Sequence, residues 1–147
     1  MFKIPDIPDI KTLKRFLHSA AKRRRAGRML QIVGIAAYFI AVFMPLISFK
    51  YDQAGWISMM EYLEKTPVCF YLYFGALIFL LAGFECADRR VTIAGALISG
   101  FSILLLILSK AYRYPGNEAD FEIGFYTYLT GCLMILAGGL LTPSKGK

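Results

Sequence analysis

The side chains that could support metal, haem or thiol chemistry are few in this chain and stand far apart. His18 is the single histidine, and Cys69, Cys86 and Cys132 are the three cysteines. Zinc sites and paired-histidine haem sites need several such ligands within one chain or at short spacings, and these residues match none of those spacings. We therefore expect no metal and no cofactor, and we expect the cysteines to be small apolar packing residues.

Hydroxyl side chains within apolar segments are the remaining candidates for chemistry. They are Ser99, Ser102, Thr127 and Thr130. A serine or threonine nucleophile needs a general base, and none of the four has one near it in sequence. Within a membrane helix such hydroxyls commonly bond to their own helix or to a neighbouring one. We expect no catalytic residue, and we predict that the chain is not an enzyme.

Four uncharged apolar segments form most of the chain and must position any functional side chain. They cover residues 29–49, 66–84, 91–109 and 123–144, and 57% of the chain is hydrophobic. A helix of about 20 residues crosses the roughly 30 Å hydrocarbon core of a bilayer, where lipid offers the backbone no hydrogen-bond partner. The sequence predicts an all-α membrane protein. We expect an antiparallel bundle of four transmembrane helices over residues 29–147, after a basic amphipathic lead-in over residues 1–28.

The basic residues lie unevenly around these segments. More than half of the 17 Lys and Arg residues precede the first segment, and Arg89, Arg90, Lys145 and Lys147 fall on the same side if the segments alternate. Short loops rich in Lys and Arg stay in the cytoplasm. We predict a multi-pass protein of the bacterial cytoplasmic (inner) membrane, with both termini in the cytoplasm.

The lead-in combines these cations with apolar residues at helical spacing. The pattern runs from Ile10 to Ala21, with Asp9 as the expected cap, and predicts a helix lying on the anionic inner leaflet. The alternative is that the basic run only enforces topology. Because the run adjoins the bilayer and lacks interleaved aromatics, we expect lipid rather than nucleic acid as its partner. The predicted lipid-interface residues are Lys11, Lys14, Arg15, Lys22, Arg23, Arg24, Arg25 and, in the first outer loop, Trp56.

The loops carry three further signals. Helical spacing of Trp56, Met59, Met60 and Leu63 predicts a short surface helix, resting in the outer headgroup layer or on the bundle. Residues 85–90 leave room only for a tight inner turn. Pro45 predicts a bend late in the first segment, because it cannot donate a backbone hydrogen bond. Aromatic residues crowd the outer ends and predict a one-sided interfacial belt that includes Tyr71, Tyr73, Tyr112, Tyr126 and Tyr128.

Small residues recur every seven positions within the apolar segments. The predicted helix-packing residues are Gly34, Ala41, Gly75, Ala82, Gly95, Ser102, Gly124, Gly131 and Gly138. Seven residues are close to two helical turns, so each set forms a nearly straight stripe that another backbone can approach closely. We expect these stripes to assemble the bundle and to leave one free for another subunit.

The fourth segment opens with the run Gly124–Gly131, which reads GFYTYLTG. This run, together with the first segment, the modest outer loop and the tight inner turn, resembles many short, uncharacterised bacterial four-span membrane proteins. The layout is also similar to that of claudins, but the outer loop holds only Trp56 and no cysteine pair, so claudin function is not implied. Tetraspanins fit less well, because this chain has no large cysteine-rich outer loop.

Three functions remain open on these grounds. We expect a non-enzymatic structural or accessory subunit that associates through small-residue helix faces with itself or with another membrane protein. The first alternative is an oligomeric pore or small-solute transporter subunit, lined by the intramembrane hydroxyls. The second alternative is an immunity protein that protects its cell from a membrane-active toxin through the outer loops.

Overall fold

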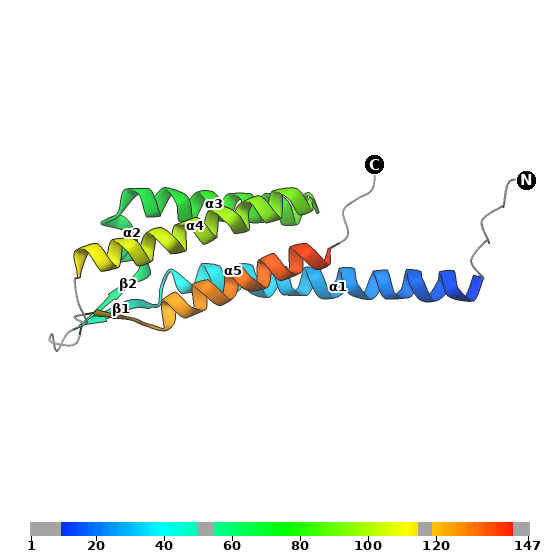
Figure 1. Ribbon diagram of the computed structural model, residues 1–147, viewed down its shortest axis with the longest axis horizontal. Helices are drawn as coiled ribbons and strands as arrows, with labels where there is room; N and C mark the ends of the chain where they lie inside the picture. Colours follow the sequence, from blue (N-terminus) through cyan, green and yellow to red (C-terminus); the bar gives the residue numbers. More distant parts are fainter. Residues whose placement is uncertain (1–9, 50–54, 115–118, 143–147) are drawn as a thin grey trace, which may run out of the picture.

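The computed structural model describes residues 10–49, 55–114 and 119–142, and it is mostly helical. Its helices are α1 (Ile10–Ala41), α2 (Met59–Glu64), α3 (Pro67–Glu85), α4 (Arg89–Arg113) and α5 (Ile123–Leu141). Its strands are β1 (Pro45–Phe49), β2 (Trp56–Ser58) and β3 (Ala119–Phe121). The long helices lie along one direction, and the strands gather at one end of the molecule (Figure 1).

Three helices are long and apolar enough to cross a membrane, which is consistent with a membrane protein. They are α3, α4 and α5, whose most apolar windows have mean hydropathies of 2.0, 2.5 and 1.5. The helices expected over residues 66–84, 91–109 and 123–144 are therefore confirmed to within a few residues at each end. Long uncharged runs give this result because a helix is the form that satisfies its own backbone in lipid.

The first apolar segment departs from the expected single helix over residues 29–49. Helix α1 ends at Ala41, and residues 45–49 form β1. The chain leaves the helix through a tight turn, in which the amide of Met44 donates to the carbonyl of Ala41 at 3.1 Å. Pro45 has no amide hydrogen with which to continue the helix. The predicted bend within a continuing helix at Pro45 is thus wrong, because the helix has already ended and Pro45 begins a strand.

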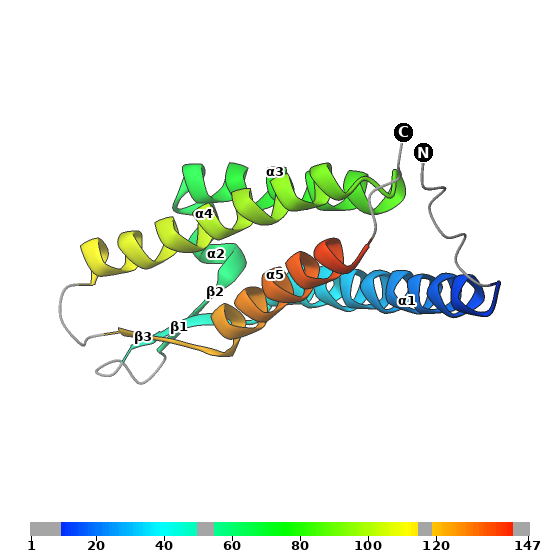
Figure 2. The ribbon, with the colours of Figure 1, turned by 45° about the vertical axis from the view of Figure 1, so that its right-hand side comes forward.

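The lead-in does not form a helix of its own. Helix α1 runs without interruption from Ile10 through the basic run to Ala41, a length of 32 residues. At 1.5 Å per residue this is about 48 Å, and the first part of α1 extends beyond the other helices (Figures 1 and 2). The expected boundary between residues 28 and 29 therefore falls inside one continuous helix and coincides with no break in secondary structure. The proposed cap Asp9 lies outside the described residues.

A three-stranded antiparallel sheet joins the two outer loops. The strand order is β2-β1-β3, and Ile47 in the central strand pairs with Ile57 on one side and Phe121 on the other. The amide of Glu122 also donates to the carbonyl of Leu46 at 2.8 Å. Strand β1 therefore satisfies its backbone through residues about 70 positions later in the chain, which a local pattern does not reveal.

The short surface helix is present in part. Strand β2 includes Trp56, and α2 begins only at Met59, after Ser58. The Ser58 hydroxyl oxygen accepts a hydrogen bond from the amide of Glu61 at 3.2 Å, which is the usual N-cap contact. The amide of Met59 donates to the carbonyl of Met44, so the start of α2 is fixed to the end of α1.

The tight turn expected over residues 85–90 is confirmed. Only Cys86, Ala87 and Asp88 separate α3 from α4, and the two helices lie side by side (Figures 1 and 2). Ala87 has a φ of 51°, in the left-handed region that favours glycine. The Asp88 carboxylate caps α4 by accepting a hydrogen bond from the amide of Arg90 at 2.8 Å.

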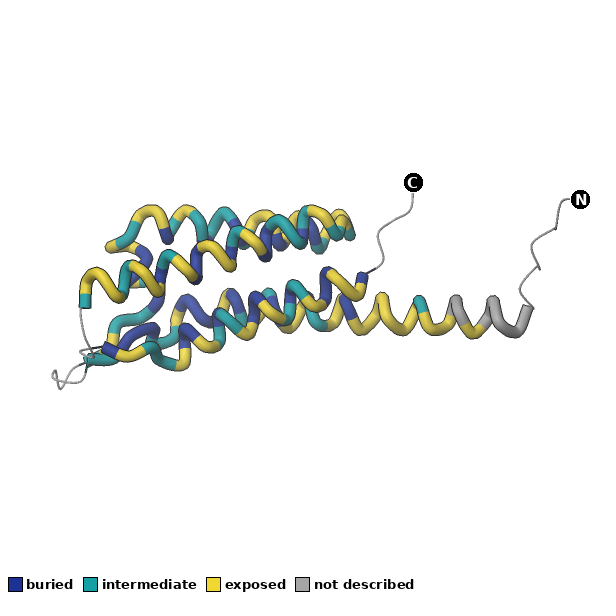
Figure 3. The backbone as a smooth tube through the Cα atoms, in the orientation of Figure 1, coloured by how far each residue is buried: buried dark blue, intermediate teal, exposed yellow. Residues whose placement is uncertain are grey.

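The core is mostly apolar with a few buried hydroxyls, and large apolar side chains are also exposed on the outward faces. The buried residues face the space between the helices, whereas the outward faces are exposed (Figure 3). In α4 the buried positions include Thr92, Ser99 and Ser102. Between Val91 and Ser109 the exposed residues of α4 are Leu97, Gly100, Phe101, Leu104, Ile107 and Leu108. Large apolar side chains on the outward faces, together with hydroxyls among the apolar residues of the core, suit a helix bundle surrounded by lipid.

Candidate functional site

Helices α1 and α5 meet along a line of glycines, which we call the glycine seam and which comprises Gly27, Gly34, Gly131 and Gly138. A methyl group on Gly34 would lie 2.8 Å from the carbonyl oxygen of Gly131. A methyl group on Gly27 would lie 2.8 Å from the carbonyl oxygen of Gly138. Glycine alone lets two helix backbones approach this closely, so the seam is a backbone-to-backbone contact.

The seam continues to the outer end of the molecule. A methyl group on Gly124 would collide with the carbonyl oxygens of Met44 and Pro45. Ala41, three residues before Met44, is fully buried. Gly34, Ala41, Gly124, Gly131 and Gly138 thus all lie at contacts within the chain. Sequence reasoning missed Gly27, although it stands seven residues before Gly34, because it lies within the basic run.

Helices α3 and α4 use a shorter version of the same contact. A methyl group on Gly95 would lie 2.9 Å from the Leu80 side chain, and one on Gly83 would lie 2.6 Å from the Thr92 hydroxyl oxygen. Gly95 was among the expected packing residues and Gly83 was not. The signal for Gly83 is weak, because a single glycine beside Ala82 does not indicate which of the two faces a neighbour.

Three small residues remain outside these contacts. A methyl group built on Gly75 in α3 or on Gly100 in α4 would meet no described atom within 4 Å. Ala82, seven residues after Gly75, is exposed. Gly75 and Ala82 were expected to pack, and within the described part of the chain they face outward instead of into the bundle.

Three tyrosines from different helices meet in the bundle core. The tyrosine cluster comprises Tyr38 of α1, Tyr73 of α3 and Tyr128 of α5, which are all buried. The rings of Tyr38 and Tyr73 stack with centroids 4.5 Å apart, and the Tyr128 ring meets Tyr38 edge-on at 4.8 Å. The expectation that Tyr73 and Tyr128 belong to an interfacial belt is therefore wrong, whereas Tyr71, Tyr112 and Tyr126 are exposed.

Tyr38 and Tyr73 bind each other's backbone. The Tyr38 hydroxyl donates to the carbonyl oxygen of Tyr73 at 2.8 Å, and the Tyr73 hydroxyl donates to the carbonyl oxygen of Tyr38. The last four carbonyls of a helix lack an intrahelical partner. Near the end of α1 the amide of Val42 donates to Phe39 and not to Tyr38, so the Tyr73 hydroxyl supplies the missing donor.

Hydroxyl groups of α4 and α5 surround the tyrosine cluster. The Tyr128 hydroxyl lies 3.4 Å from both the Tyr38 hydroxyl and the carbonyl oxygen of Ser99. The Ser99 hydroxyl donates to the carbonyl of Gly95 in its own helix at 2.9 Å. The Ser102 hydroxyl is fully buried and has no hydrogen-bond partner in the described part of the chain.

The remaining residues considered for chemistry lie apart from the tyrosine cluster. The Thr127 hydroxyl donates to the carbonyl of Ile123 at 2.8 Å, and Thr130 is exposed on α5. Cys69 and Cys132 are buried, but Cys86 is exposed in the inner turn. The expectation that all three cysteines pack in the interior is therefore wrong for Cys86, because the turn leaves no second layer of protein over it.

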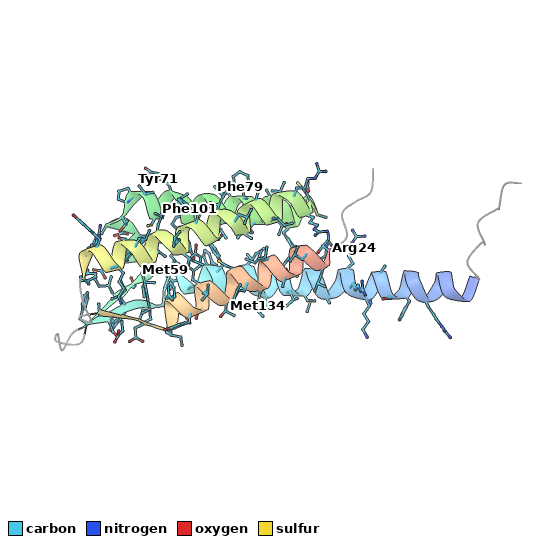
Figure 4. All side chains as sticks on the ribbon, viewed as in Figure 1. Arg24, Met59, Tyr71, Phe79, Phe101 and Met134 are labelled. Atoms are coloured by element: carbon cyan, nitrogen blue, oxygen red, sulfur yellow. The ribbon has the colours of Figure 1, made fainter. Side chains whose placement is uncertain are left out.

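The expected lipid-interface cations form an exposed surface on α1. Arg15, Lys22, Arg23, Arg24 and Arg25 are all exposed, and Figure 4 shows Arg24 on the part of α1 at the end of the bundle. The side chains of Lys11 and Lys14 lie outside the described residues. Trp56 is 58% exposed in β2, on the outer sheet. The cations and Trp56 thus occupy opposite ends of the molecule.

A polar contact closes the outer end between α2 and α4. The Tyr62 hydroxyl donates to the Ser109 hydroxyl oxygen at 2.7 Å, and the Arg113 guanidinium lies 5.4 Å from the Tyr62 ring centre. Arg113 also donates to the carbonyl oxygen of Lys65 at 2.7 Å. Burial raises the pKa of Tyr62, and the Ser109 hydrogen bond and the Arg113 charge oppose that rise.

These features hold helices together by close packing and buried hydrogen bonds. The glycine seam joins α1 to α5, and the tyrosine cluster joins α1, α3 and α5. Among the described residues, no three His, Cys, Asp or Glu side chains lie close enough to hold a metal ion. Comparisons of this chain with protein-family models, with curated proteins and with solved structures found no match.

Proposed function

We propose that this chain is a non-enzymatic accessory subunit of a bacterial cytoplasmic membrane, which crosses the bilayer four times and associates with a second copy through the outward face of α3. Close helix packing is its main chemistry. One observation supports this proposal. The glycines of α1 and α5 pack against other parts of the chain, whereas Gly75 and Ala82 on α3 face outward without such a contact.

A fourth crossing by α1 is supported by the glycine seam. Gly27 lies against Gly138, Gly34 against Gly131, and Pro45 against Gly124. The residue numbers on α1 rise as those on α5 fall, so residues 27–45 accompany the whole membrane-crossing part of α5 in the opposite direction. A segment that stays beside α5 from Gly138 to Gly124 passes through the same depth of lipid.

The orientation is proposed from the basic end of α1. The exposed cations from Arg15 to Arg25 precede Gly27, and Arg89 and Arg90 begin α4 at the inner turn. Loops with this excess of Lys and Arg remain in the cytoplasm. The basic end of α1 then reaches the anionic headgroups of the inner leaflet, at about 1 kcal/mol for each cation near the surface.

The outward face of α3 suits a helix of another subunit. Gly75 and Ala82 stand seven residues apart, which aligns them on one side of the helix. Small residues on a lipid-facing surface leave a groove into which a neighbouring backbone fits, and this fit drives helix association where both lipid and protein are apolar. Phe79, which Figure 4 shows on the outside of α3, borders the groove.

Disulfide cross-linking in native membranes tests the association. In a Cys86→Ser background, which removes the exposed thiol, we expect Ala82→Cys to give a covalent dimer on mild oxidation. The matched control is Leu133→Cys on α5, which is equally accessible to lipid and should remain monomeric. Adding Gly75→Ile to the Ala82→Cys chain should reduce the dimer by filling the groove. A monomer in both cysteine variants, together with a lone monomer in native mass spectrometry, contradicts the proposal.

Reporter fusions test the crossings separately. A reporter that is active only in the cytoplasm should be active when fused after residue 147 and also when fused before residue 1. A reporter that is active only outside the cytoplasm should be active when inserted between β1 and β2. An external carboxyl terminus beside a cytoplasmic amino terminus would leave three crossings, and it would remove α1 from the membrane.

A further inference from the structure

A cavity outside the bundle opens where α2 turns into α3. It has a volume of about 300 Å³ and is lined by Glu64, Pro67, Phe70 and Tyr71. Glu64 is the last residue of α2, and Pro67 is the first of α3, so the cavity lies at one end of a membrane-crossing helix. The proposed crossing of the bilayer by α3, on which this inference rests, places the cavity at the depth of the lipid headgroups.

The walls of this cavity combine one carboxylate with two aromatic rings. The rings of Phe70 and Tyr71 stand at 89° with centroids 5.8 Å apart, so they form two walls of a corner. Tyr71 is 74% exposed and points away from the other helices (Figure 4). Aromatic faces beside a carboxylate are the surroundings that recognise ammonium groups, because both the ring quadrupole and the carboxylate attract a cation.

The carboxylate of Glu64 is available to an external cation. The nearby Lys65 ammonium pairs with Glu61 at 3.2 Å, one helical turn earlier. Arg113 is engaged by the Tyr62 ring and by the carbonyl of Lys65. Within the described part of the chain no cation pairs with Glu64.

The backbone that carries Glu64 is held in place by several contacts. The Thr66 hydroxyl donates to the carbonyl of Tyr62 at 3.0 Å, and the Thr66 amide donates to the carbonyl of Leu63 at 3.0 Å. Arg113 fixes the carbonyl of Lys65 from α4. A site whose backbone is already ordered binds a ligand without the entropy cost of ordering a loop.

We propose that the cavity formed by Glu64, Pro67, Phe70 and Tyr71 binds an ammonium group, with the Glu64 carboxylate as counter-ion and the aromatic rings as its walls. At headgroup depth this ammonium group belongs to the ethanolamine of phosphatidylethanolamine. A free amine dissolved in water presents the same ammonium group to the cavity. The cavity does not include Gly75 or Ala82, which lie further along α3, but Tyr71 precedes Gly75 by one helical turn and borders the proposed association face.

Native mass spectrometry of the full chain tests this site. The protein is offered an equimolar mixture of phosphatidylethanolamine and phosphatidylglycerol, and the ratio of the two singly lipid-bound species is recorded. We expect the wild-type chain to favour phosphatidylethanolamine, and we expect Glu64→Gln to lower that ratio about fivefold, the loss that corresponds to one cation contact at an exposed site. Tyr71→Ala should lower the ratio as well, by removing one wall from an exposed position.

Glu61→Gln is the matched control. It removes the same charge three residues earlier on α2, but Glu61 faces Lys65 and does not line the cavity. The ratio should stay within about twofold of the wild-type value, since an exposed pair contributes little. Equal effects of Glu64→Gln and Glu61→Gln would overturn the proposal, and so would a wild-type chain without preference between the two lipids.

Competition by free ethanolamine distinguishes the two sources. Displacement of bound phosphatidylethanolamine by millimolar ethanolamine supports recognition of the ammonium group by itself. Retention of the lipid at that concentration, with the ratio still dependent on Glu64, supports recognition of the ammonium within an intact headgroup. Circular dichroism and thermal unfolding of each variant confirm that the changes in ratio do not arise from misfolding.

Discussion

The carbonyl oxygen of Gly131 lies only 2.8 Å from the place where a methyl group on Gly34 would stand. The reverse distance, from a methyl group on Gly131 to the carbonyl oxygen of Gly34, is 2.9 Å. The backbones of the two helices are therefore in direct contact, beside the Ile135 side chain, whose Cγ1 would lie 2.7 Å from the same methyl group on Gly34. In lipid, where apolar side chains gain nothing by leaving the solvent, such a close fit is the main source of association.

Replacing one glycine of the seam should destabilise the fold. We expect Gly131→Ala to cost about 1–3 kcal/mol, because the added methyl group must push two backbones apart. The control is Gly100→Ala on α4, where the methyl group meets open space and the higher helix propensity of alanine applies. Thermal unfolding in mild detergent, followed by circular dichroism, measures both. Equal melting temperatures for the two variants would show that the seam is not a tight contact.

Removing the Tyr73 hydroxyl should weaken the contact between α1 and α3. Tyr73→Phe leaves the carbonyl of Tyr38 without a donor, and we expect a loss of about 1–2 kcal/mol. Tyr71→Phe, two residues earlier and 74% exposed, should leave stability unchanged. A double-mutant cycle with Tyr38→Phe in the same unfolding assay measures the coupling. A coupling energy of zero would mean that the reciprocal pair does not hold the two helices together.

Ser102 and Ser99 should respond differently to loss of their hydroxyls. The Ser102 hydroxyl is buried without a partner, so Ser102→Ala should be neutral or stabilising by up to about 1 kcal/mol. The Ser99 hydroxyl donates to Gly95, and Ser99→Ala should not gain stability. Comparing the unfolding of the two variants tests this order. A marked loss for Ser102→Ala would reveal a bound group that needs the hydroxyl.

Tyr62 should make stability depend on alkaline pH. Burial raises its pKa above the ordinary value of about 10, so the folded chain holds this proton more tightly than the unfolded chain does. The resulting stabilisation is complete below pH 10 and declines as the pH rises from there towards the raised pKa. Unfolding measured between about pH 9 and pH 11 should show a shallower decline for Tyr62→Phe. Tyr112→Phe, which is 89% exposed, should keep the wild-type slope.

Sequence patterns located the three helices that are long and apolar enough to cross a membrane, because uncharged runs of that length leave the backbone no other form in lipid. They did not separate α1 from β1. Residues 45–49 are as apolar as the residues before them, and a short apolar run does not distinguish a strand from a helix. Its partner β3 lies in the other outer loop, and a pairing across that separation leaves no local signature.

Some of the packing residues were also predictable from the sequence, and others were not. A sevenfold stripe marks Gly34, Gly131 and Gly138 as close-contact positions, but it does not indicate which stripes meet. Gly27 was not recognised as a packing residue, because it lies within the basic run and not in an apolar segment. Tyr73 and Tyr128 were assigned to an interfacial belt because their sequence position gives a depth in the membrane, whereas the face that they present depends on how the helices rotate against one another.

Strand β1 lies at the centre of the sheet, between β2, which follows it closely in the sequence, and β3, which follows much later. During synthesis β2 follows within a few residues, but β3 emerges from the ribosome only after α3 and α4 have been made. A nascent chain that stops before residue 119 therefore keeps one row of amides and carbonyls on β1 open. Until residues 119–121 arrive, that edge can pair with any extended peptide, and pairing with β3 closes it.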